Sequence, residues 1–128
     1  MTRDSLMLAY ETIEEGTKYL PKLEKALGEV GEKFQIGNSN EAMQQLLPCL
    51  EGLEWLMQVL YYIPRDIFPS DEFRGQWQTN YQELINIMNK FIEGLEERDY
   101  MLAGDLVIYE LLPNLSDWEN TLLNLLNH

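Results

Sequence analysis

Apolar residues in the first 34 positions recur at alternating steps of three and four, and this spacing restricts the fold more than any other feature. The pattern places every member on one side of a long α-helix, a side that another part of the chain must cover. Two members, Ala9 and Gly16, are small, so we expect a neighbouring backbone to approach closely there. The nine positions are Leu6, Ala9, Ile13, Gly16, Leu20, Leu23, Leu27, Val30 and Phe34.

The same spacing occurs in later segments, and together they predict four helices. We expect the first helix to stop at Gly37, and Asn38 with Glu41 resembles a capping box at the start of the second. Ser70 and Asp99 are the expected N-caps of the third and fourth helices. The apolar positions are Met43, Leu46, Leu50, Leu53, Met57 and Leu60 in the second helix, and Trp77, Tyr81, Leu84, Met88, Phe91 and Leu95 in the third.

The connections between these helices are short, which favours antiparallel neighbours, and no segment alternates with the period of a strand. We therefore expect an all-α fold, an up-down-up-down four-helix bundle formed by a single domain over residues 1–128. The second helix should end before Pro64, and the fourth should run from Tyr100 toward Asn127. The first half of the fourth helix is apolar nearly all round, which predicts a place inside the bundle.

Three of the predicted helices contain the motif Leu-Pro-X-Leu, around Pro21, Pro48 and Pro113. An interior proline removes a backbone hydrogen bond and bends the helix axis, so we expect proline-kinked helices that splay and leave a groove. The repeated motif also suggests duplication of a helical hairpin, with residues 1–63 and 70–128 as the halves. Coincidence in a leucine-rich chain is the alternative.

Residue types that carry catalysis or bind metals are scarce. Metal-binding bundles use Glu-x-x-His pairs, whereas the sole histidine here is the final residue, His128. Cys49 has no basic neighbour in sequence that would activate it, and we expect it to be a core thiol. We therefore expect no enzyme, no metal and no cofactor, with a weak divalent-cation site as the alternative. A single cysteine and no apolar run near the N-terminus suit the cytoplasm.

The formal net charge is −13. Such a surface repels phosphate backbones and anionic lipids, so we expect neither nucleic acid nor membrane as a partner. No lysine or arginine lies between Lys33 and Arg65, and none follows Tyr100. The exposed faces of the second and fourth helices are therefore acidic, which attracts a basic segment of another protein. Plain solubility is the alternative reason for this charge.

Two features indicate a recognition surface. Trp55 and Tyr62 are seven residues apart, so they project from one otherwise polar side of the second helix, and exposed aromatics framed by acids are typical of interfaces. Packing of Trp55 against the fourth helix is the alternative. Asp105 lies among apolar residues, where its carboxylate either accepts a hydrogen bond from a tyrosine or a helix N-terminus, or anchors a partner's basic residue. The predicted partner-binding residues are Trp55, Tyr62, Glu51, Gln58, Asp105 and Glu110.

The segment from Asn40-Glu41-Ala42-Met43 to Glu51-Gly52-Leu53-Glu54-Trp55-Leu56, together with residues 99–113, resembles a group of uncharacterised small acidic helical proteins of spore-forming, often flagellated bacteria. The turn followed by Asn-Glu-Ala is also loosely similar to the flagellar export chaperones. That resemblance implies a small acidic four-helix protein that holds a partner's amphipathic helical segment until secretion.

These features together predict a non-enzymatic protein-binding module, either export-chaperone-like or an adaptor, that holds an amphipathic or basic helical segment of a partner protein. The alternative is a structural homodimer without a separate ligand. In that case, apolar surface on the third and fourth helices would be buried against a second copy.

Overall fold

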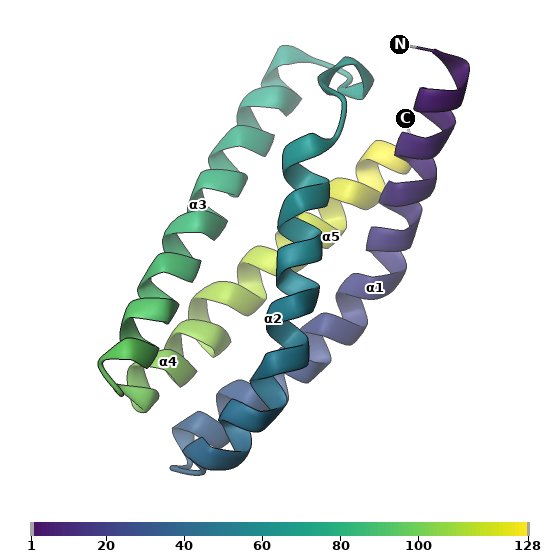
Figure 1. Cartoon of the computed structure of the whole chain (residues 1–128). Coiled ribbons are helices and arrows are strands. Elements are labelled where there is room, and N and C mark those ends of the chain that lie inside the picture. Colours follow the sequence, from purple (N-terminus) through teal and green to yellow (C-terminus); the bar gives the residue numbers. More distant parts are fainter. Residues whose placement is uncertain (1, 128) are drawn as a thin grey trace.

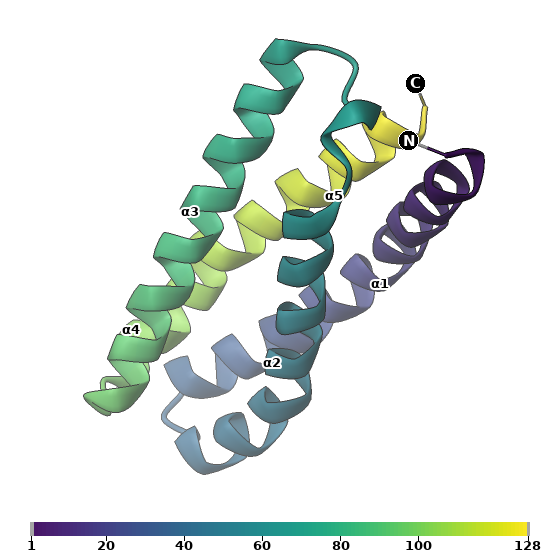
Figure 2. The same cartoon turned by 45° about the horizontal axis from the view of Figure 1, so that its top comes forward.

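The computed structural model describes residues 2–127 and places four helical rods side by side (Figures 1 and 2). The first three rods are α1 (Arg3–Gln35), α2 (Ser39–Tyr62) and α3 (Asp71–Glu96). A short 3-10 turn, η1 (Arg65–Ile67), connects α2 to α3. The fourth rod consists of α4 (Tyr100–Leu106), the π-helical turn η2 (Val107–Leu111) and α5 (Leu112–Leu126). The predicted all-α four-helix bundle is confirmed, and residues 2–127 contain no strand.

Successive rods run in opposite directions, and the start of α1 lies at the same end of the bundle as the end of α5 (Figure 1). The helix α1 packs along α2 on one side and along α4 and α5 on the other, while α3 packs on α4 and α5. Over the described part of the chain, the backbones of α2 and α3 come close at few positions, and the two helices meet mainly through the side chains of Trp77, Tyr61 and Tyr81. The bundle is therefore closed on three of its four seams and open between α2 and α3.

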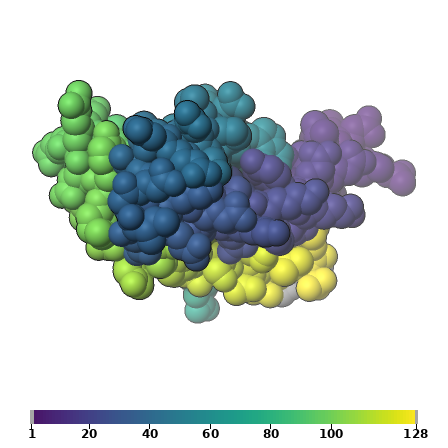
Figure 3. Space-filling model, turned by 90° about the horizontal axis from the view of Figure 1, so that it is seen from below, coloured from purple at the N-terminus to yellow at the C-terminus, as the bar shows by residue number. Residues whose placement is uncertain are grey.

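The seam predicted for α1 is the buried side of that helix. Eight of its nine members are buried, and the exception is Leu6, which is 37% exposed. Leu6 lies in the N-terminal part of α1, which projects at one side of the molecule in the view from below (Figure 3). The close approach expected at Gly16 is made by the Leu122 side chain rather than by a backbone.

The buried side of α2 differs from the prediction by a rotation of the helix. Leu46, Leu53 and Leu60 are buried as expected, but Met43 is 39% exposed. The stripe of Ala42, Cys49 and Leu56, also spaced by seven, is buried as well. Periodicity located an apolar side of α2, but the position of α1 decided which edge of that side is covered.

The expectation that the fourth rod is enclosed in its first half is wrong. Met101 is 54% exposed, Leu102 is 43% exposed and Tyr109 is 71% exposed. This rod is covered by α1 and α3 on two sides, and α2 does not reach over α4. Its buried side is formed by Ala103, Gly104, Leu106, Val107 and Leu111.

The π-helical turn was not predicted. Within it, the Leu112 N–H donates to the carbonyl of Val107, five residues earlier, and Pro113 follows directly. The proline nitrogen carries no hydrogen, so a widened turn at this place accommodates a residue that cannot donate to the helix. Pro21 and Pro48 lie inside α1 and α2. Bending of the helix axes at the three prolines stays a prediction.

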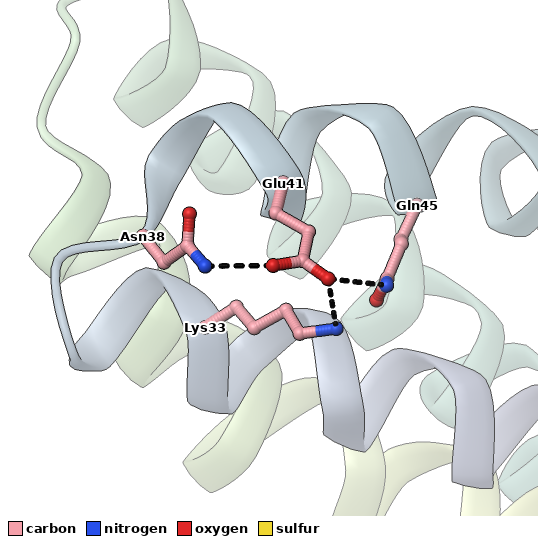
Figure 4. Close-up of polar contacts among 4 residues, drawn as sticks. All are labelled: Lys33, Asn38, Glu41 and Gln45. Atoms are coloured by element: carbon pink, nitrogen blue, oxygen red, sulfur yellow. Dashed lines mark hydrogen bonds and ion pairs between the residues drawn. The ribbon is translucent and has the colours of Figure 1, made fainter.

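The predicted caps of α3 and α4 are confirmed. The Ser70 hydroxyl accepts the Phe73 N–H at 3.1 Å, and the Asp99 carboxylate accepts the Leu102 N–H at 3.2 Å. Asn38 is the N-cap of α2, but the predicted capping box is wrong in detail, because the Asn38 amide donates to the Glu41 carboxylate at 2.8 Å instead of accepting a backbone N–H (Figure 4).

Glu41 connects α1 to α2 next to this turn. Its carboxylate lies 3.1 Å from the Lys33 ammonium of α1 and accepts a hydrogen bond from Gln45 at 3.3 Å (Figure 4). Lys33 first, and then the Asn38 amide, hold the pKa of Glu41 below its ordinary value. The exposed carboxylate therefore stays ionised at neutral pH and ties the first two helices together.

The turns from α1 to α2 and from α3 to α4 close in the same way, with paired backbone hydrogen bonds around a residue in the left-handed conformation. That residue is Gly37 in the first turn, with φ of 84°, and Arg98 in the second, with φ of 57°. The bonds run from Asn38 N–H to Lys33 O, Gly37 N–H to Phe34 O, Asp99 N–H to Gly94 O and Arg98 N–H to Leu95 O.

We expect Arg98→Gly to raise the free energy of unfolding by about 1 kcal/mol, because a side chain at positive φ is strained and glycine is not. Urea unfolding followed by circular dichroism measures the change. Gly37→Ala is the matched control in the other turn and should have the opposite sign. A destabilised Arg98→Gly variant would contradict the left-handed assignment.

Candidate functional site

Two hollows adjoin Trp55 along the outer junction of α1 and α2. The first has a volume of about 410 Å³ and lies between the start of α1 and the end of α2. The second has a volume of about 440 Å³ and lies between the middle parts of the two helices. Because Trp55 lines both, they form one depression, which we call the Trp55 groove.

Each helix lines the Trp55 groove with residues at alternating steps of three and four. The helix α1 contributes Ser5, Leu8, Thr12, Glu15 and Tyr19. The helix α2 contributes Pro48, Glu51, Trp55, Gln58 and Tyr62. This spacing forms a second seam on each helix, beside the one that packs into the core, and such a pair of seams is the surface on which a further helix packs.

Trp55 lies at the centre of the groove and is half-buried. Its ring packs edge-on against Tyr19 of α1, with the ring centroids 5.6 Å apart and the planes at 86°. The alternative that Trp55 packs against the fourth helix is therefore wrong, because α1 lies at that position. Four of the predicted partner-binding residues do line this groove, namely Glu51, Trp55, Gln58 and Tyr62.

Tyr62 is 75% exposed, and it lines the first hollow of the groove together with Leu8, which is 63% exposed. The side chains of α1 that complete the groove were not predicted from the sequence. Their signal was present, since Ser5, Leu8, Thr12, Glu15 and Tyr19 repeat the helical spacing one position before the core seam. Because several members of this stripe are polar, it resembles an ordinary solvent-exposed side of a helix.

The charged residues that line the groove are both acidic, Glu15 and Glu51. Partial burial raises the pKa of the Tyr19 hydroxyl above its ordinary value, and the charges of Cys49 and Glu51 raise it further. The phenol therefore stays neutral and the nearby carboxylate carries the local charge. The groove presents apolar, aromatic and negatively charged groups, which suit a basic amphipathic ligand.

The other two predicted partner-binding residues lie on different interfaces. Asp105 is half-buried and accepts a hydrogen bond from the Gln35 side chain of α1 at 3.0 Å. The prediction that Asp105 accepts a hydrogen bond is confirmed, but the donor is the Gln35 amide rather than a tyrosine or a helix N-terminus. Glu110 faces α3, where its carboxylate lies 3.8 Å from the Lys90 ammonium. The structure does not bring these two residues together with Trp55.

A third hollow, of about 340 Å³, lies on the open seam between α2 and α3. It is mainly apolar, with side chains that include Leu50, Met57, Tyr61, Tyr81 and Met88. The same two helices are joined by a hydrogen bond in which the Trp77 indole N–H donates to the Leu60 carbonyl at 3.1 Å. Leu50, Met57, Tyr81 and Met88 were predicted to be core residues of the second and third helices, so this hollow was not predicted.

Two observations concern the thiol and the metal-ligating side chains of the described residues. Cys49 is buried as predicted, and burial, followed by the charge of Glu29, raises the pKa of its thiol. The reactive thiolate is therefore disfavoured. Within residues 2–127, no three His, Cys, Asp or Glu side chains are grouped to hold a metal ion, and His128 lies outside these residues.

None of the helices in residues 2–127 combines the length and apolar character that crossing a membrane requires. No curated protein and no solved structure matches the chain significantly. The model of one protein family, described as "Domain of unknown function (DUF8042)", matches residues 11–121. That match extends over most of α1 through α5 and includes Trp55 and most of its groove. The chain therefore belongs to the DUF8042 family.

Proposed function

We propose that the protein is a non-enzymatic protein-binding module, export-chaperone-like or an adaptor, whose Trp55 groove holds an amphipathic helical segment of a partner protein. The observation that carries the proposal is the pair of matched outer seams on α1 and α2, with Trp55 between them. A helix laid along the groove inserts its own apolar side chains between these residues, as helices do in known groove complexes.

Charge defines the partner further. The groove is lined by Glu15 and Glu51, α2 carries no lysine or arginine, and the whole chain has a net charge of −13. A basic segment is attracted to this surface and an acidic one is repelled, which speeds encounter and selects the partner. The single buried thiol of Cys49 suits a reducing compartment, and we place the protein in the cytoplasm.

Site-specific photo-cross-linking in the cells that naturally make the protein tests the proposal. A benzophenone amino acid at Thr12 or Gln58, which line the groove, should capture the same basic helical segment of one partner. The same amino acid at Gln82, which is exposed on α3, should not. The captured segment, made as a peptide, should bind the purified protein with one peptide per chain.

The affinity of the captured peptide for a variant that lacks the central aromatic side chain tests the proposal quantitatively. Trp55→Ala should weaken peptide binding by about thirtyfold, since a central aromatic anchor contributes about 2 kcal/mol or more. Tyr109→Ala is the matched control, because Tyr109 is a 71% exposed aromatic of the fourth rod that lines neither hollow of the groove. Equal losses in the two variants, or no loss in Trp55→Ala, would contradict the proposal.

A structural homodimer is the rival function, and one observation favours it. Ile92 on α3 and Met101 and Leu102 on α4 are between 43% and 54% exposed, so apolar surface is available on the third and fourth rods. Light scattering of the purified protein separates the two. A stable dimer, together with the absence of any cross-link from Thr12 or Gln58 to another protein, would replace the binding-module proposal with the rival.

A further inference from the structure

The second hollow of the Trp55 groove, between the middle parts of α1 and α2, is an aromatic and acidic pocket. Its volume is about 440 Å³, and its chemically distinctive side chains are Glu15 and Tyr19 from α1 and Glu51 and Trp55 from α2. In the described part of the chain, the acidic partners of the ion pairs are Glu14, Glu41 and Glu110, so neither pocket carboxylate forms an ion pair with a lysine or arginine of this chain. We call these four residues the Trp55 pocket.

Gly52 allows the two rings to take these positions. A Cβ atom at residue 52 would overlap the Tyr19 hydroxyl, so only glycine leaves room for the Tyr19 side chain across α2. Tyr19 then meets Trp55 at 86°, and in such a perpendicular pair one ring presents only its edge to the other. Ring faces that the pair does not cover carry negative potential and attract cations, most strongly at an indole.

We propose that the Trp55 pocket binds the side chain of an arginine in the partner segment, which rests on the function proposed above. The guanidinium packs against the Trp55 indole, and its N–H groups donate to the carboxylates of Glu15 and Glu51. The pocket thereby combines cation–π attraction with charge-assisted hydrogen bonds at one anchor point.

The geometry favours arginine over lysine. The two carboxylates come from different helices, so a ligand that satisfies both must donate in more than one direction. The planar guanidinium presents five N–H groups in a rigid fork, stacks on aromatic faces and is weakly hydrated. An ammonium is compact and strongly hydrated, and it loses more solvation when it enters a pocket with an indole wall.

The first hollow of the groove, which adjoins the Trp55 pocket, determines which side chains of the partner segment should lie near the arginine. Its lining includes Leu8, Val59 and Tyr62, and Trp55 is shared by the two hollows. A helix in the groove that inserts an arginine into the Trp55 pocket therefore places large apolar side chains, three or four and seven residues away, in the adjoining hollow. The partner segment is expected to carry one arginine followed or preceded by such an apolar stripe.

Titration of the isotope-labelled full chain by NMR tests the inference without a partner protein. Nα-acetylargininamide is the probe, with acetylcitrullinamide as a neutral isostere and acetyllysinamide as the competing cation. The Trp55 indole and Gly52 amide signals should shift saturably with the arginine probe, and the indole signals of the buried Trp77 and Trp118 should stay in place. The affinity of the lysine probe should be lower than that of the arginine probe by a factor of about five or more, and the citrulline probe should not bind.

Charge-neutral variants provide the control for nonspecific attraction. Glu51→Gln and Glu15→Gln should each lower the affinity for the arginine probe about threefold or more, which corresponds to the loss of one charge-assisted contact in a partly solvated site. Glu54→Gln removes a charge one turn along α2 but outside the Trp55 pocket, and should leave the affinity unchanged.

An unshifted Trp55 indole, equal binding of the lysine probe, or an equal loss in Glu54→Gln would overturn the arginine assignment. The result is distinguishable from failure of the proposed function. If the photo-cross-linked segment binds but the arginine probe does not, only the pocket assignment falls. If the arginine probe binds but no helical segment is ever captured in the groove, the proposed function falls.

Discussion

Gly104→Ala is expected to lower the free energy of unfolding by about 2 to 3 kcal/mol, as overpacking of a tight contact does. A Cβ atom at residue 104 would lie 2.9 Å from the carbonyl oxygen of Gly31, 2.9 Å from Cβ of Phe34 and 3.1 Å from Cγ of Gln35. The first two atoms are fixed by the backbone of α1, so the helices α1 and α4 must separate to admit the methyl group.

Separation of these helices would also disturb contacts on either side of the crossing. Phe34 stacks on Tyr100 with ring centroids 5.7 Å apart, and Gln35 donates to Asp105 at 3.0 Å. Chemical unfolding in urea, monitored by circular dichroism, measures the loss. A signal from Trp77 and Trp118 fluorescence should report the same midpoint if the bundle unfolds as one unit.

Gly75→Ala is the matched control. Gly75 lies in α3, and a Cβ atom there would meet nothing within 4 Å. The substitution should therefore raise the free energy of unfolding by about 0.5 to 1 kcal/mol, because alanine is the better helix former. Gly31→Ala should fall between the two, since the atoms closest to its new Cβ belong to the Ile108 and Val107 side chains, which can move. A stable Gly104→Ala variant would contradict the close crossing.

Asn114→Leu is expected to raise the free energy of unfolding by about 1 to 2 kcal/mol, because it removes a buried amide that lacks a protein partner. Asn114 is 3% exposed, and neither its amide oxygen nor its amide nitrogen has a hydrogen-bond partner among the described residues. Leucine has the same branching at Cγ, so it retains the packing of α5 while replacing the polar atoms with methyl groups.

The comparison variant is Asn120→Leu, which changes an exposed asparagine of the same helix. Its stability should stay within about 0.5 kcal/mol of the unchanged protein, as is usual for surface substitutions. Thermal and urea unfolding of the two variants, side by side, give the difference. A destabilised Asn114→Leu protein would show that the buried amide is satisfied, for example by an internal water, and the prediction would then be wrong.

Local signals in the sequence accounted for the helices and their ends. The seam from Ala9 to Phe34 is buried as predicted, Ser70 and Asp99 cap their helices, and Gly37 ends α1 in the left-handed conformation. These features depend on residues within one or two helical turns of each other. They are therefore readable from the order of residues alone.

The candidate site was predicted in part. Trp55 and Tyr62 were singled out because they stand on a polar side of α2, and they line a groove. The seam of α1 that forms the opposite wall was missed, as were the position of Tyr19 across Gly52 and the true neighbours of Asp105 and Glu110. Each of these depends on which helix lies opposite, which periodicity does not specify.

By itself the sequence determined four amphipathic helices, most of their ends and the purely acidic charge of the second and fourth helices, because periodicity, caps and charge act over short stretches of chain. Only the tertiary structure decided that α1 and α4 cross at Gly31 and Gly104, that the backbones of α2 and α3 come close at few positions, and that Trp55 meets Tyr19. The physical reason is that packing depends on the shapes of two surfaces at once, whereas a helical repeat describes one surface at a time.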